Sequence, residues 1–242
     1  MAETAIKLGG KRKRTFGDEL REMLPEGNLN LCLTCGLCSS GCPASGFDAM
    51  DPRKFLRMLS LGMDEELLAS RWPWFCSMCQ RCVRVCPMEI DIPQMIYRVR
   101  QQVPRDQRPK GILHSCDTAL ASESLSAMGT SPEDFEWIVN DVLEETQNEQ
   151  PEFKDMVAPL DKEGAHFIVN QNSREPQTEP DEMVPLWKIL HLVGADWTYP
   201  KTAWAGENYC LFLADDEGWE DITRKAAEVT DRLGCKIFLN TE

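Results

Sequence analysis

The chain has 242 residues, 42% of them apolar, which is enough for one or two ordinary domains with hydrophobic cores. Residues 1–114 hold 17 basic and 13 acidic side chains, a balance of +4, whereas residues 115–242 hold 9 and 27, a balance of −18, so the negative charge of the chain, −14 in total, comes from the second half. This acidity argues against nucleic acid as the main partner. The sequence predicts no membrane span, because no stretch approaches 18 apolar residues, and no secretory signal at the N-terminus.

The first third of the chain is predicted to be helical. Residues 1–28 are expected to form a flexible arm with one short helix, Phe16–Leu24. The basic run Lys11–Arg14 follows two glycines, and we interpret it as a solvated tail rather than as a site for phosphate or a membrane surface. A helix is predicted over Asp51–Leu59, because its first two residues suit the N-cap and the first helical position. Two more helices are predicted over Asp64–Arg71 and Pro93–Val103.

Helices are predicted to continue over residues 110–160, where Ser131 suits an N-cap and Pro132 the first helical position. After Pro159, short apolar runs alternate with amphipathic stretches. The predicted elements are strands over 166–169, 209–213 and 236–239, a polar loop over 170–182, and helices over 183–193 and 218–233. Strands that alternate with helices indicate a small parallel α/β layer.

Eight of the eleven cysteines form two groups of the same spacing. The groups are Cys32-x2-Cys35-x2-Cys38-x3-Cys42-Pro43 and Cys76-x2-Cys79-x2-Cys82-x3-Cys86-Pro87. Both match the bacterial ferredoxin run, C-x2-C-x2-C-x3-C-P, at every cysteine and at the proline. The sequence therefore predicts two [4Fe–4S] clusters.

The spacing also predicts which thiolates share a cluster. Three cysteines two residues apart wrap one cluster, and the chain is then too short for the fourth to reach the same one, so the fourth binds the neighbouring cluster. The expected ligand sets are Cys32, Cys35, Cys38 and Cys86 for one cluster, and Cys76, Cys79, Cys82 and Cys42 for the other. Such swapped ligation would hold the clusters side by side.

Two other uses of the cysteines fit the pattern poorly. Structural zinc commonly takes cysteine pairs and has no use for the third cysteine or the following proline. Disulfides within either group would be strained, because four cysteines lie within eleven residues.

The residues that flank the second group allow two interpretations each. Trp72, Trp74 and Phe75 either shield a cluster from water or belong to the core. Arg81 and Arg84 either favour the reduced cluster or face solvent. The three histidines, His114, His166 and His191, are scattered, and we interpret them as structural. The sequence contains no nucleophile–base pair, phosphate loop or flavin fingerprint, so no catalytic residue is assigned.

The segment Leu31–Arg100, with LCLTCGLCSSGCP, MDPRKFLRMLSLG and WFCSMCQRCVRVCPMEIDIPQMIYRVR, resembles iron–sulfur subunits related to heterodisulfide reductase. It is also similar to the cluster domain of fumarate reductase iron–sulfur subunits. The continuation PRDQRPKGILHSCDTALASESLSAMG resembles the cytoplasmic subunits of membrane redox complexes in sulfate-reducing bacteria.

The resemblance implies an α+β chain in which an α-helical ferredoxin domain with two [4Fe–4S] clusters precedes a small, incomplete α/β domain. The expected parts are a flexible arm (1–28), the α-helical ferredoxin domain (29–110), a helical connector (111–160) and an α/β segment like the start of a cysteine-rich domain (161–242). Family members continue into a domain with paired cysteines that hold a further cluster. Here Cys210 is followed by Leu211, and we interpret Cys210 and Cys235 as buried, inert residues.

The function implied is that of an electron-transfer subunit in a quinone-linked membrane complex of anaerobic respiration. Its partners would be other subunits of the complex, including a membrane cytochrome or quinone-reactive subunit. The chain would be cytoplasmic and peripheral on the inner face of the cell membrane. Two alternatives stay open: a catalytic subunit that reduces a disulfide at a third cluster, and the iron–sulfur subunit of a flavin dehydrogenase.

Overall fold

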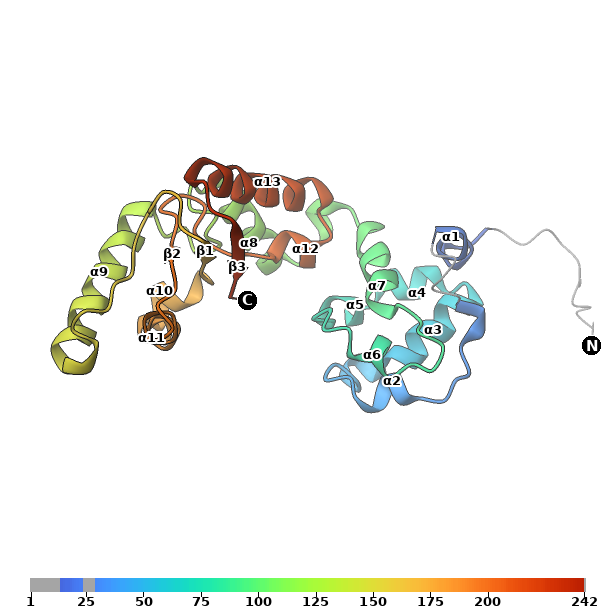
Figure 1. The fold of residues 1–242 in the computed structure, drawn as a ribbon. Helices are drawn as coiled ribbons and strands as arrows, with labels where there is room; N and C mark the ends of the chain where they lie inside the picture. Colours follow the sequence, from blue (N-terminus) through green and yellow to red (C-terminus); the bar gives the residue numbers. More distant parts are fainter. Residues whose placement is uncertain (1–13, 24–28, 242) are drawn as a thin grey trace, which may run out of the picture. The chain divides into compact units, whose positions relative to one another are not determined.

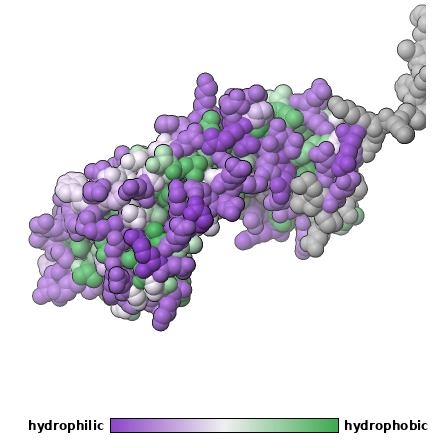
Figure 2. Space-filling view, turned by 90° about the horizontal axis from the view of Figure 1, so that it is seen from above, coloured by the Kyte–Doolittle hydropathy of each residue, from purple (hydrophilic) through white to green (hydrophobic). Residues whose placement is uncertain are grey.

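A computed structural model describes residues 14–23 and 29–241 of the chain, which form two compact units, Met1–Pro104 and Arg105–Glu242 (Figure 1). Helices dominate both units, and a three-stranded sheet lies in the second, so the chain is of mixed α+β class, as predicted. No helix within the described ranges is long and apolar enough to cross a membrane. The face drawn in Figure 2 is largely hydrophilic, with apolar side chains in small separate areas.

The first unit is built from short helices, and its described residues contain no strand. Its elements are α1 (Phe16–Met23), η1 (Leu29–Leu31), α2 (Leu37–Ser40), η2 (Phe47–Ala49), α3 (Pro52–Leu61), α4 (Asp64–Ala69), α5 (Trp72–Phe75), α6 (Arg81–Arg84) and α7 (Ile92–Gln101). The three helices predicted after the arm are thus confirmed as α3, α4 and α7. Residues 1–13 and 24–28 of the predicted arm, which include most of the basic run and the expected helix end at Leu24, lie outside the described residues.

Helix α3 begins at the predicted cap, Asp51, and runs two residues beyond the predicted end at Leu59. The Asp51 carboxylate accepts a hydrogen bond from the Lys54 amide at 2.9 Å, which satisfies one of the free N–H groups of the first turn. At the other end Gly62 has a φ of 69°, a left-handed conformation that glycine adopts without steric cost. These two residues fix the length of the helix that separates the two cysteine groups.

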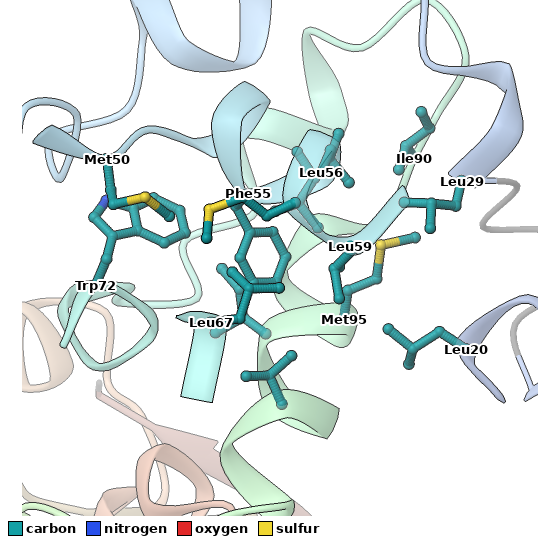
Figure 3. Packing of buried hydrophobic residues seen from close by; sticks show 14 residues of the cluster. Leu20, Leu29, Met50, Phe55, Leu56, Leu59, Leu67, Trp72, Ile90 and Met95 are labelled. Carbon is teal, nitrogen blue, oxygen red and sulfur yellow. The ribbon is translucent and has the colours of Figure 1, made fainter. Parts of the chain in front are cut away.

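The core of the first unit is centred on α3. Phe55, Met58 and Leu59, whose spacing places them on one face of this helix, are buried, and so is Leu56. Figure 3 shows Phe55 between Trp72 and Met95, which come from α5 and α7. The Phe55 and Trp72 ring centroids are 5.6 Å apart. Because this core joins segments from before, between and after the cysteine groups, it fixes both groups on one body.

The second unit places a small sheet among helices. Its elements are η3 (Arg105–Gln107), α8 (Lys110–Ala121), α9 (Pro132–Glu149), η4 (Pro151–Phe153), β1 (Phe167–Asn170), α10 (Arg174–Thr178), η5 (Pro180–Met183), α11 (Val184–Leu192), β2 (Trp197–Thr198), α12 (Tyr209–Leu213), α13 (Asp216–Leu233) and β3 (Ile237–Asn240). The strand order is β2-β1-β3, and both pairings are parallel, which confirms the predicted parallel layer.

Helix α9 belongs to the core around this sheet. Phe135 of α9 stacks on Trp204 with ring centroids 4.1 Å apart and meets Tyr199 edge to face. Trp187 donates its indole N–H to the Tyr199 hydroxyl at 3.0 Å, and this hydroxyl donates to Gln171 at 2.8 Å. Residues 132–149 therefore contribute directly to the hydrophobic core of the α/β segment.

Three predictions for the second unit were wrong. Tyr209–Leu213 is the helix α12 and not a strand, because its buried residues Cys210 and Leu213 are three apart and face α8. The second strand is instead Trp197–Thr198, a pair too short to give a recognisable pattern. The polar loop predicted over 170–182 contains α10 and η5.

Cys210 is buried, as predicted, but it is not a free thiol. Cys116 of α8 and Cys210 of α12 form a disulfide, with Cα atoms 5.1 Å apart and 94 residues of sequence separation. Both side chains are fully buried, and α8 and α12 lie side by side in Figure 1. Cys235 is a half-buried free thiol.

Candidate iron–sulfur cluster sites

The two cysteine groups have the same backbone conformation. Thr34 and Met78, at equivalent positions before the second cysteine, have φ values of 58° and 56°. Gly36 and Gln80, directly after that cysteine, have φ values of 84° and 59°. Left-handed conformations are uncommon for residues other than glycine and concentrate at functional sites. In each group a short helix follows, α2 or α6, so the repeated spacing produces a repeated loop.

The first pocket gathers four cysteines from both groups. It is lined by Cys32, Cys35 and Cys38 of the first group together with Cys86, the last cysteine of the second. The rest of the wall is mainly apolar and includes Leu56, Ile90 and Ile92.

The second pocket has the complementary composition. It is lined by Cys76, Cys79 and Cys82 of the second group together with Cys42, the last cysteine of the first. Its wall further includes the apolar residues Trp72, Phe75, Ile92 and Ile96. Each pocket thus contains three cysteines from one group and one from the other.

The donor set of each pocket fits a [4Fe–4S] cluster. Such clusters are bound by four cysteine thiolates, and an apolar wall controls how much water reaches them. Within the described residues, no three histidine, cysteine or carboxylate side chains are placed to hold one metal ion. A cluster differs from a single ion because its four thiolates bind four separate irons.

The two pockets are adjacent within the first unit. Helices α2 and α6, which carry Cys38 and Cys82, pack against each other (Figure 1). The contact is close at Gly41, where a Cβ atom would lie 2.9 Å from Nε of Arg81. A side chain at position 41 would therefore displace Arg81, which lines the second pocket.

Hydrogen bonds tie both groups to the helical core. Ser39 of α2 donates its hydroxyl to the Asp51 carboxylate at 2.7 Å, so the residue that caps α3 also holds the first group. Trp72 donates its indole N–H to the carbonyl of Ala44 at 3.0 Å, which links α5 to the loop after Cys42. These bonds fix the ligand loops relative to the core.

A buried arginine holds the start of the second group. Arg100 of α7 is 1% exposed, and its guanidinium donates to the carbonyl of Pro73 at 2.7 Å and to that of Cys76 at 2.6 Å. The same guanidinium lies 5.4 Å from the centre of the Trp74 ring. The Cys76 sulfur accepts a hydrogen bond from the Met78 amide at 3.4 Å.

Burial raises the pKa values of several pocket thiols. It raises the pKa of Cys82 to about 12, with a further contribution from the neighbouring Cys76 thiolate. It raises the pKa of Cys76 and of Cys38 as well. These thiols therefore stay protonated at neutral pH without metal, and cluster binding has to displace their protons. Burial lowers the pKa of Arg100 to about 10, which leaves the guanidinium charged at neutral pH.

These pKa values predict an order of thiol reactivity in the metal-free chain. Only the thiolate reacts with iodoacetamide, and at pH 8 about one Cys82 thiol in 10⁴ is ionised when the pKa is about 12. We expect Cys82 to be alkylated at least about tenfold more slowly than the exposed Cys79, with a rate that still rises above pH 10. Peptide mass spectrometry after timed alkylation measures both rates. Equal rates at pH 8 would contradict the burial of Cys82.

The flanking aromatic residues have different surroundings. Trp72 is buried and lines the second pocket, so it serves both the core and the pocket wall. Phe75 lines the same pocket but is 42% exposed. Trp74 lies under Arg100.

The charged and titratable candidates are more exposed. Arg81 lines the second pocket and is exposed, and Arg84 is exposed as well. None of His114, His166 and His191 lines either described pocket.

The sequence interpretation did not single out Arg100. Its signal was a charged residue on the apolar stripe of α7, four residues after Ile96 and adjacent to Val99.

Comparison with known proteins defines the class. Residues 26–90 match the family described as "4Fe-4S dicluster domain", which spans both cysteine groups. This segment of the chain is thus similar to iron–sulfur domains of the dicluster type.

The relatives are C subunits of heterodisulfide reductases. Over 85 residues the chain is 33% identical to a protein of Archaeoglobus profundus named as like the C subunit of heterodisulfide reductase, covering 34% of this chain and 45% of the relative. Over 73 residues it is 34% identical to the second iron–sulfur C subunit of the CoB–CoM heterodisulfide reductase of Methanocaldococcus jannaschii, covering 30% and 39%. The aligned segment spans less than half of these relatives, and no solved structure matches. These matches confirm that the chain is similar to the C subunit of heterodisulfide reductase.

Proposed function

We propose that this chain is an electron-transfer subunit of a multisubunit redox complex and relays single electrons through two [4Fe–4S] clusters. The observation that carries the proposal is the composition of the two pockets, each with three cysteines of one group and one of the other. Bound [4Fe–4S] clusters take up and release electrons one at a time. The protein supplies the thiolates, the apolar walls and a fixed separation between the two sites.

In this proposal the ligands are swapped between the groups. Cys32, Cys35, Cys38 and Cys86 would bind the first cluster, and Cys76, Cys79, Cys82 and Cys42 the second. Two features support this assignment: the cysteines that line each pocket, and the packing of α2 against α6, which brings the two groups together.

Electrons would enter and leave where the ligands approach the surface. Cys35 and Cys79, the middle cysteines of the two groups, are the exposed thiols among the eight, whereas the other six are half-buried. Exposed apolar side chains line the same pockets, Leu33 and Leu37 with Cys35, and Phe75 with Cys79. A partner that docks there could approach a cluster closely while covering apolar surface.

We further propose a place for the chain in a quinone-linked membrane complex, peripheral on the cytoplasmic face and with a membrane cytochrome as a partner. The resemblance of residues 104–129 to cytoplasmic subunits of such complexes supports this proposal. So do the names of the relatives, which are subunits of larger reductases.

One observation weighs against the catalytic alternative. A third, disulfide-reducing cluster on this chain would need Cys210 as a ligand, but Cys210 is bonded to Cys116. The flavin dehydrogenase alternative differs only in its partner, and it would share the relay proposed for this chain.

Iron and sulfide analysis of the anaerobically reconstituted chain tests the relay. Two [4Fe–4S] clusters predict about eight irons and eight sulfides per chain, and two one-electron signals in an EPR redox titration. A third cluster would raise the iron content to about twelve and would support the catalytic alternative. A content of about one or two irons without sulfide would contradict both.

A further inference from the structure

The buried guanidinium of Arg100 is hydrogen-bonded to the backbone of a cysteine that lines the second pocket. Its side chain is 1% exposed, and it donates hydrogen bonds to the carbonyls of Pro73 and Cys76. Cys76 is the first cysteine of its group and lines the pocket. Arg100 therefore contacts a proposed cluster ligand through the backbone and does not itself line the pocket.

These hydrogen bonds fix the chain at the point where α5 ends. The carbonyls at a helix C-terminus have no partner within the helix, and the guanidinium supplies donors in a rigid planar arrangement. The two bonded carbonyls belong to Pro73, within α5, and to Cys76, the residue directly after it. The guanidinium therefore holds the end of α5 and the first cysteine of the second group together. The Cys76 sulfur accepts a hydrogen bond from the Met78 amide at 3.4 Å, which ties this side chain to the loop that follows it.

The charge of Arg100 acts on the same site. Arginine stays protonated in proteins, and a charge in the interior is screened much less than a charge in water. Uptake of an electron makes a thiolate-bound cluster more negative, so a nearby buried cation stabilises the reduced form and raises the reduction potential. The first pocket has an arginine in its wall too, Arg53, but that residue is exposed to solvent.

We propose that Arg100 is a positioning residue for the second cluster and that its buried charge makes this cluster the more easily reduced of the two. The proposal rests on the proposed relay function. It gives the relay a preferred acceptor site, the second pocket, because an electron shared between the clusters resides mainly where the cation lies. The effect is electrostatic: the fixed positive charge of Arg100 stabilises the more negative, reduced cluster, and no proton is transferred.

Redox titrations followed by EPR test the proposal on the full reconstituted chain. Arg100→Gln is expected to shift the one-electron equilibrium of the second cluster at least tenfold towards the oxidised form, which is about 59 mV for one electron. The first cluster is expected to keep its potential. Arg100→Lys keeps the charge and should recover most of the shift, whereas Arg57→Gln removes an exposed charge of α3 and should change neither potential. Unchanged potentials in a fully loaded Arg100→Gln protein would overturn the proposal.

If the Arg100→Gln protein does not bind a cluster in the second pocket, the proposal can still be tested by comparing the two cluster potentials of the wild-type protein. Cys42→Ala and Cys86→Ala are each expected to retain one cluster, which assigns the two wild-type potentials to the pockets. The more positive potential should belong to the second pocket, and the opposite assignment would overturn the proposal. Failure of the relay itself is distinguishable, because the wild-type chain would then contain no [4Fe–4S] signals.

Discussion

Replacing Cys42 with alanine is expected to remove the second cluster and to leave the first in place. Cys42 belongs to the first group by sequence but lines the second pocket, beside Cys76, Cys79 and Cys82. Removal of one of four thiolates leaves an iron without its protein ligand, so the second cluster should be lost or degraded. Iron content is expected to fall from about eight to about four per chain, and the EPR signal of one cluster should disappear.

Cys86→Ala is the matched variant for the other pocket. It is expected to remove the first cluster and to retain the second, because Cys86 lines the pocket of Cys32, Cys35 and Cys38. Cys235→Ala, which removes a cysteine that lines neither pocket, should retain about eight irons. Loss of the first cluster in Cys42→Ala would contradict the swapped ligand sets and would assign each group to its own cluster.

The cysteines that line each pocket could be predicted from the sequence, because the spacing that groups them is local. Covalent spacing alone limits which thiolates reach one cluster, and the proline after the last cysteine of each group turns the chain away. The cap at Asp51 is local as well, and it lies where the sequence predicts it. Long-range packing was not needed for either inference.

The features that the sequence did not reveal depend on distant segments. Tyr209–Leu213 has the composition of a strand, but packing against α8 stabilises a helix, so tertiary contacts override the local preference. The partner of Cys210 is 94 residues away, which no spacing rule could identify. In the sequence, Arg100 is one of several charged residues on a predicted helix. Only the fold brings its guanidinium to the carbonyl of Cys76, 24 residues earlier in the chain.

Reducing the Cys116–Cys210 disulfide is expected to lower the free energy of unfolding of the second unit by about 4–5 kcal/mol. The bond closes a loop of 94 residues, and the chain-entropy treatment of cross-links gives about 4.7 kcal/mol for a loop of about 100 residues. The bond also joins α8 to α12, whose buried residues share one small hydrophobic cluster. The helices should therefore lose protection together when the bond is absent.

Two measurements on the metal-free chain check this expectation. Alkylation after unfolding without reductant should label nine of the eleven cysteines, and labelling of all eleven would contradict the bond. Urea unfolding, read by hydrogen-exchange mass spectrometry of peptides from α8 and α12, gives the loss of stability for the reduced chain and for the double variant Cys116→Ala, Cys210→Ala. Cys235→Ala is the control and should change the free energy of unfolding of this unit by less than about 0.5 kcal/mol.

The disulfide also bears on where the chain resides. Reducing compartments keep most thiols free, and disulfides that persist there are usually transient or redox-sensing. At the proposed cytoplasmic location, the second unit would therefore have a bonded state and a reduced state that differ by about 4–5 kcal/mol in stability. The cysteines of the two pockets lie in the other unit, so changes in the disulfide should leave the iron content at about eight per chain. Loss of iron on forming or reducing this bond would show instead that the two units are coupled.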